Sequence, residues 1–231
     1  MKPKINKGLL ALLAASLITL LAAPAWGGDK EKDEQTLKNA ASVFKQITQD
    51  ANVPASVLAK ADCIIVLPEV KKFGIGIGGS GGRGAMSCRE GAKFDGKWSA
   101  PAMYSIGGVS AGLQVGGSST DYVLLVTQEK GVNAVLNDKT KLGSDASAAA
   151  GPSGATAKDM GSDMLVYAKA KGLFAGVSLD GATLHQDVDA NQRLYGKKIV
   201  ARDIVRESTV QTPAGGEELI AELNSKVPKH H

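Results

Sequence analysis

The stretch that most constrains the fold of this chain is an alternating run within residues 98–117. From Val109 to Val115 every second residue is apolar, and serine, glycine and glutamine stand between them. Alternation with a period of two is typical of a β-strand that buries one face. Because the other face is nearly bare of side chains, a ligand or another segment can approach its backbone closely. The run therefore predicts a strand with one buried face and one accessible face.

Other strand signals lie on both sides of this run. Residues 63–67 form an apolar, β-branched run that Pro68 should end, and residues 122–126 have the same character. Between them, seven of the eleven residues from 74 to 84 are glycine. Asp95-Gly96 favours a tight hairpin turn. Shorter strand signals lie at residues 85–89 and 97–106, and residues 163–179 are predicted to form a hairpin.

Helix signals lie near both ends of the chain. Apolar residues at three- and four-residue spacing predict an amphipathic helix over residues 36–50, with Phe44 and Ile47 on its stripe. A short helix should begin at Pro54, and another should span residues 216–226. Together these signals predict a single α+β domain. It should have a curved, barrel-like antiparallel sheet, the N-terminal amphipathic helix and a few short helices.

The first 25 residues have the pattern of a signal peptide. Three lysines precede an apolar run from Gly8 to Ala23, and Ala23-Pro24-Ala25 matches a cleavage site. We therefore expect export to the periplasm or outer envelope, or secretion. Residues 26–35 would form a charged tail, residues 36–206 the folded domain, and residues 207–231 a polar C-terminal segment with a short helix.

Removal of that leader leaves a nearly neutral protein. The full chain has 27 basic and 23 acidic residues, and three of the lysines lie in the leader, so the remainder has a formal net charge of +1. Nucleic-acid binding depends on a basic surface that neutralises phosphates, so a nucleic acid is not expected as a partner.

Two cysteines remain, Cys63 and Cys88. An exported protein lies in an oxidising compartment. There the two cysteines either form a disulfide, which we slightly favour, or stay as two buried thiols that act as small apolar side chains.

Patterns for catalysis or cofactor binding are weak. Gly74-x-Gly76-x-x-Gly79 has the letters of a dinucleotide site, but the residues that follow are poor helix formers. Residues 187–198 begin like a calcium loop but lack its glycine and final glutamate, so a helix cap at Asp189 is the better interpretation. His185 has no nucleophile placed by a motif. We expect no enzyme activity, no catalytic residues, no metal and no cofactor.

What remains is the surface. Six basic residues would form a rim that binds anionic lipid if they lie together, and are otherwise ordinary solvated charges: Lys71, Lys72, Arg83, Arg89, Lys93 and Lys97. Phe44 and Ile47 allow two interpretations. They pack on the sheet, which is commoner for such a stripe, or they lie in the lipid interface.

Five segments in order resemble the SYLF domain, over about residues 58–196. They are the run at 98–117, Lys141–Pro152, Lys171–Leu179, Asp189-Ala-Asn191 and Tyr195-Gly196. The resemblance implies a lipid-binding family, with phosphoinositides as ligands in eukaryotes and actin binding in yeast members. This chain looks like an exported bacterial member without an SH3 or FYVE domain.

Export would separate the protein from cytosolic actin and phosphoinositides. The implied ligand is therefore another anionic phospholipid in an envelope membrane. The alternative is a structural or protein-interaction domain, with filament binding as its extreme form and an unidentified protein as partner.

Overall fold

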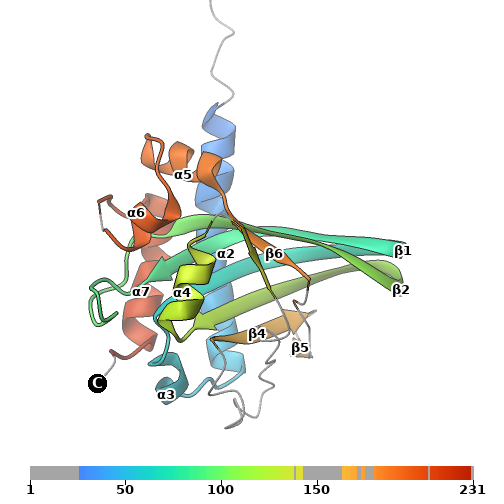
Figure 1. Cartoon of the computed structure of the whole chain (residues 1–231), viewed down its shortest axis with the longest axis horizontal. Helices are drawn as coiled ribbons and strands as arrows, with labels where there is room; N and C mark the ends of the chain where they lie inside the picture. The colour runs from blue at the N-terminus through green and yellow to red at the C-terminus, as the bar shows by residue number, and fades with distance from the viewer. Residues whose placement is uncertain are drawn as a thin grey trace, which may run out of the picture.

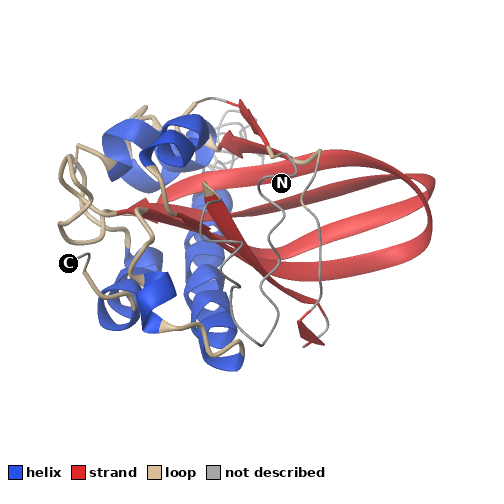
Figure 2. Cartoon of the chain, turned by 60° about the horizontal axis from the view of Figure 1, so that its bottom comes forward, coloured by secondary structure: helices blue, strands red, loops and turns tan. Residues whose placement is uncertain are grey.

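The computed structural model describes residues 26–137, 139–142, 163–170, 173–174, 179, 181–207 and 209–229. Its central feature is a ribbon of two long antiparallel strands, β1 (Cys63–Cys88) and β2 (Ala102–Val126). The ribbon leaves the body of the protein, doubles back on itself and returns (Figure 1 and Figure 2). Both ends of each strand therefore lie in the body, and the middle of each strand lies at the far end.

Shorter strands extend this ribbon into a curved antiparallel sheet. β6 (Thr183–Gln186) pairs with the first part of β2, and β3 (Lys139–Lys141) pairs with β6. β4 (Met164–Ala170) pairs with the last part of β2, and β5 (Leu173–Phe174) pairs with β4. The predicted α+β fold with a curved antiparallel sheet is confirmed.

The strands are fewer and longer than the sequence predicts. Pro68 does not end the first strand, because the pairing shifts between Leu67 and Val70 and absorbs the missing amide. Glu69 has a positive φ of 48° there, and its amide donates to the Asp121 carboxylate over 2.8 Å. Likewise, residues 97–126 contribute one continuous strand after a loop, not three separate strands.

Glycine explains how β1 can lie against itself. A Cβ on Gly84 would overlap the carbonyl oxygen of Val66, and one on Gly82 would lie 2.9 Å from Cγ2 of Val70. Both contacts join the outgoing half of β1 to its returning half. The glycine-rich run is therefore a packing requirement of the folded-back ribbon. It lies within a strand with no helix after it, which excludes the dinucleotide-site interpretation.

Two hydrophobic cores lie on the two faces of the sheet. On one face, β1 and β2 pack against α2 (Trp26–Asp50), α3 (Ala55–Leu58) and α7 (Glu217–Lys226). On the other face they pack against α4 (Glu129–Val135) and α6 (Ala201–Val205). The period-two pattern decides the face: Ile65 and Leu67 belong to one core, and Ile64 and Val66 to the other.

Helix α2 corrects two predictions. It begins at Trp26, so residues 26–35 are helical and not a charged tail. Phe44 and Ile47 are fully buried against the sheet, which rules out their role in a lipid interface. The stripe that the sequence shows is the core-facing side of this helix.

Two helices from the last third of the chain contribute to the body of the protein. α7 matches the helix predicted at residues 216–226, and its Leu219 and Leu223 are buried. Helix α5 (Val188–Tyr195) is capped by Asp187, whose carboxylate accepts from the amide of Ala190, and not by Asp189 as predicted. Gly196 ends it with a φ of 70°, a left-handed conformation that favours glycine.

Candidate functional site

The feature most suited to binding is the outer end of the β1–β2 ribbon, here called the ribbon end and defined as residues 70–82 and 106–120. It protrudes at the right of Figure 1, while the helices gather around the opposite end of the ribbon. Two large apolar side chains are exposed on it: Phe73 is 66% exposed and Val109 is 80% exposed. Val109 was predicted to be buried, and the other side chains of that alternating run, at residues 110–116, lie outside the described side chains.

Phe73 and Val109 lie on the same face of the ribbon end. Val109 pairs with Gly79 across the two strands, so both project to one face. The ring of Phe73 lies 3.5 Å from the position that a Cβ on Gly79 would take, which places the ring on that face as well. Lys71 precedes Phe73 by two residues in continuous register and pairs with Ser119. Among the side chains that the structure describes, this face therefore presents two apolar side chains, a lysine and a serine.

The opposite face is partly covered. A Cβ on Gly108 would lie 3.1 Å from the Cα of Ala182, and the hydroxyl of Ser80 donates to the Gly108 carbonyl over 3.5 Å. Lys72 projects to this face and is partly buried, and this burial lowers the pKa of its ammonium group. The two adjacent lysines therefore have different surroundings.

The charge of the ribbon end has a single sign. Residues 70–88 contain Lys71, Lys72 and Arg83 and no acidic residue, and residues 102–120 contain no charged residue. Glu69 and Asp121 stand at its base, where they contact each other through the Glu69 amide. An exposed apolar pair beside lysines, without carboxylates, suits a surface that is both apolar and anionic.

The family of the chain follows from a sequence match that begins within β2 and extends to α7. A family model described as "Las17-binding protein actin regulator", Ysc84, matches residues 107–226. The chain belongs to the Ysc84 family. This agrees with the resemblance to the SYLF domain and extends it to α7.

Several eukaryotic proteins are similar to this Ysc84-family chain. SH3 domain-containing YSC84-like protein 1 of Homo sapiens is 32% identical over 206 residues, which cover 84% of this chain and 59% of the human protein. Protein YSC84 of Saccharomyces cerevisiae is 31% identical over 204 residues, 82% of this chain and 42% of the yeast protein. An SH3 domain-containing protein of Schizosaccharomyces pombe is 36% identical over 183 residues, 76% of this chain and 41% of that protein. The chain spans about half the length of these relatives.

Arg83 is not the exposed lipid ligand that the sequence predicts. Its guanidinium donates to Asp33 over 2.6 Å and to Asp187 over 2.9 Å. Asp33 is fully buried and also binds Arg193 over 2.6 Å. Burial opposes the charge of Arg83, but its bonds to the two carboxylates outweigh this effect and raise its pKa. Arg83 therefore joins β1 to α2 and α5.

Arg89 is buried at the body end of the ribbon, which corrects its assignment to a lipid rim. Its guanidinium donates to the carbonyls of Val227 and Pro228 over 2.7 and 2.6 Å. It also lies over the ring of Trp98, 4.8 Å from the ring centre. Burial lowers its pKa. Arg89 holds the C-terminal segment against the sheet.

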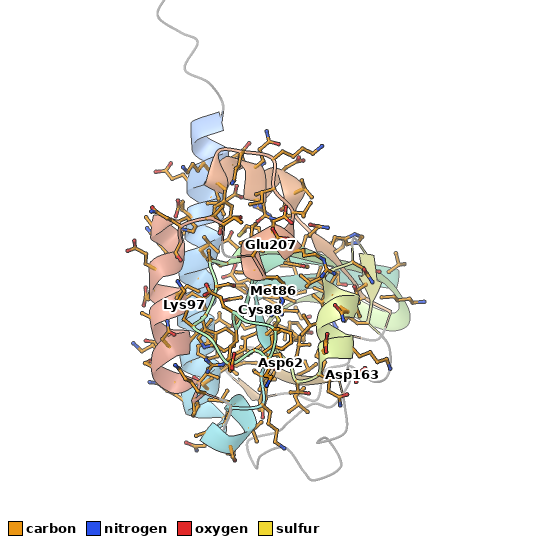
Figure 3. All side chains as sticks on the ribbon, turned by 60° about the vertical axis from the view of Figure 1, so that its left-hand side comes forward. Asp62, Met86, Cys88, Lys97, Asp163 and Glu207 are labelled. Carbon is orange, nitrogen blue, oxygen red and sulfur yellow. A yellow bond between two sulfur atoms is a disulfide. The ribbon has the colours of Figure 1, made fainter. Side chains whose placement is uncertain are left out.

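Lys93 and Lys97 are exposed on the loop between β1 and β2, and Lys97 lies 3.7 Å from Glu90. Figure 3 looks onto this end of the molecule, where Lys97 lies near Cys88 and Asp62. Lys71 is eight strand residues from Cys63, roughly 25 Å along β1. The six basic residues therefore do not form one rim, because the ribbon carries them to opposite ends of the molecule.

Cys63 and Cys88 form a disulfide in the structure, with their Cα atoms 4.0 Å apart. They are the first and last residues of β1. The bond therefore closes the base of the folded-back strand, and both residues are fully buried.

The sequence patterns do not single out Phe73 or Asp33, and they place Val109 on a buried face. Asp33 continues the stripe of the helix four residues before Leu37, so an acidic residue in an apolar series was the available signal. For Val109 the alternation gives the face of the strand but not what covers that face.

Within the described ranges, no three potential metal ligands among His, Cys, Asp and Glu come together. No helix of the described chain is long and apolar enough to span a membrane.

Proposed function

We propose that this Ysc84-family protein is a non-enzymatic module that binds anionic phospholipid membranes through the ribbon end. The observation that carries the proposal is the exposure of Phe73 and Val109, beside Lys71, on one face of the protruding ribbon end, which contains no acidic residue. Of the six basic residues predicted to form a rim, Lys71 takes part, whereas Arg83 and Arg89 are engaged within the protein.

The expected affinity is modest. Burial of a phenylalanine or valine side chain contributes roughly 1.5–3 kcal/mol, and each lysine near an anionic surface contributes about 1 kcal/mol. Two apolar side chains and Lys71 therefore support weak, reversible binding. The electrostatic part should weaken as salt rises, because screening acts within about 8–10 Å.

The test is sedimentation with vesicles of phosphatidylcholine, with and without phosphatidylglycerol, at two salt concentrations. Wild type should bind the anionic vesicles, more weakly at high salt, and the neutral vesicles poorly. The double variant Phe73→Ser, Val109→Ser should lose binding and keep the melting temperature of wild type, since both side chains are exposed. Equal binding by the double variant would remove the ribbon end from the mechanism.

We also propose that the protein works in a bacterial envelope, as the leader pattern in residues 1–25 suggests. N-terminal sequencing of protein from the envelope of the producing cell should find a chain that begins near Trp26 or Gly28. Recovery of the form that begins at Met1 would contradict export with cleavage.

A second candidate function is protein binding, which the family description as an actin regulator favours. Its test is sedimentation with actin filaments in the absence of lipid. Filament binding that survives Phe73→Ser, Val109→Ser, together with indifference to vesicles, would favour this second function over the first.

A further inference from the structure

The two faces of the ribbon end differ enough to assign the side that meets the lipid. The face that carries Phe73 and Val109 is also the face of α2, because Arg83 projects from the same side of β1, four residues beyond Gly79, and reaches Asp33 on that helix. Helix α2 crosses the sheet nearer the body and leaves the ribbon end free of helices (Figure 1). On the opposite face the turn at Ala182 lies against Gly108.

We infer that the phosphate of a lipid head group binds on the α2 side of the ribbon end, to Lys71 and Ser119, while Lys72 takes no direct part. This inference rests on the proposed membrane binding and adds an orientation and a ligand pair to it. Lys71 and Ser119 are directly opposed cross-strand partners, and both are exposed. Their Cβ atoms should lie about 5 Å apart, close enough for one phosphate to accept from both the ammonium and the hydroxyl.

The apolar pair explains why a lipid phosphate fits this site better than a free phosphate ion. Phe73 follows Lys71 on the same face, one side-chain position nearer the tip. When Phe73 enters the acyl region, Lys71 and Ser119 come to the depth of the head groups. Lys72 and its partner Ser118 project to the other face and point away from the bilayer surface.

The adjacent lysines provide a matched experiment. Lys71→Glu and Lys72→Glu make the same change of charge one residue apart, and their effects are compared on vesicles of phosphatidylcholine and phosphatidylglycerol. Lys71→Glu should reduce partitioning about tenfold or more, and Lys72→Glu about threefold or less. Equal losses would overturn the assignment of the face but leave membrane binding intact. No binding by wild type would instead contradict the proposed function itself.

Fluorescence gives a second test that does not depend on charge. Gly117→Trp and Ser118→Trp place an indole on the two faces at neighbouring exposed positions, and neither replaces a proposed phosphate ligand. Brominated lipids should quench the added fluorescence of Gly117→Trp, after subtraction of the wild-type signal, and leave that of Ser118→Trp unchanged. Stronger quenching at residue 118 would reverse the orientation. A tenfold excess of inorganic phosphate over lipid should not displace the protein from vesicles, and displacement would show a site for the free ion.

Discussion

The two ends of the β1–β2 ribbon are built from the same pair of strands in opposite ways. At the body end, both faces carry large buried side chains, such as Ile64 and Ile65 on β1 and Leu124 and Leu125 on β2. At the ribbon end, the strands carry glycine and serine, and Phe73 and Val109 face solvent. The pairing of the backbones continues through both regions.

This difference suggests that the body end determines stability and the ribbon end determines binding. The body end has two cores, a disulfide and the ion pairs of Asp33, so its substitutions should change the free energy of unfolding. At the ribbon end, Phe73 and Val109 are exposed, so substitution of these side chains should change binding with little effect on stability.

The largest effect is expected at Gly84. In Gly84→Ala the new Cβ would overlap the carbonyl of Val66 and lie 2.9 Å from the Cα of Leu67, and backbone atoms cannot move aside cheaply. We expect a loss of about 4 kcal/mol or more, or failure to fold. In the control, Gly81→Ala, the nearest atom is 3.9 Å away, so stability should stay within about 1 kcal/mol of wild type. Urea unfolding measures both, and similar values would refute the packing of β1 against itself.

Two phenylalanines give the next comparison. Phe44 is fully buried between α2 and the sheet, and Phe73 is exposed. Phe44→Ala should lower the free energy of unfolding by about 3–5 kcal/mol through cavity formation, whereas Phe73→Ala should change it by less than about 0.5 kcal/mol. Vesicle binding per folded molecule should fall in Phe73→Ala and stay near the wild-type value in Phe44→Ala. A stable Phe44→Ala protein with weakened lipid binding would restore the interfacial role of α2.

Local patterns predicted the elements of the body end well. The stripes of α2 and α7 bury the side that their spacing indicates, and the continuous apolar run at residues 122–126 is buried on both faces, as predicted. Such elements can be predicted because a buried helix face imposes a repeat of 3.6 residues, and a strand buried on both faces requires a continuous apolar run. The start of α2 at Trp26 was missed because its first turns are polar and are anchored through Asp33 and Glu34, whose partners lie far along the chain.

The doubling back of the ribbon could not be predicted in the same way. Glycine is compatible with turns, bulges and strands, so the run at residues 74–84 does not specify that Gly84 meets Val66. The predicted lipid-binding rim was wrong for a related reason. Arg83 finds its partners on α2 and α5, 50 and 104 residues away, and no local pattern reports such distant carboxylates. The sequence pattern therefore predicted one rim from six basic residues that the ribbon separates in space.

The disulfide should have an intermediate effect on the body end. Replacement of both Cys63 and Cys88 by alanine opens a loop of 25 residues, which should cost about 3.5 kcal/mol in the chain-entropy model. Vesicle binding of the remaining folded protein should be unchanged, because the bond lies at the base of β1. Thiol titration of denatured, unreduced wild type from the envelope should find no free thiol. Two free thiols there, with no loss of stability in the double variant, would mean that the cysteines act as apolar side chains.

The smallest effect concerns Tyr195, which packs between the two cores and donates its hydroxyl to the carbonyl of Pro101 over 2.6 Å. Burial, aided by the charge of Glu34, raises the pKa of this hydroxyl above its usual value of 10. Above pH 10 the unfolded chain loses this proton while the folded chain keeps it, so stability should fall as pH rises. Tyr195→Phe should cost about 1 kcal/mol at pH 8 and should lose less stability than wild type between pH 9 and pH 11. Urea unfolding at these pH values measures the difference, and parallel curves would show that Tyr195 ionises equally in both states. The stability of Tyr195→Phe should still fall somewhat as pH rises, because burial also raises the pKa of Tyr122 in the same body end.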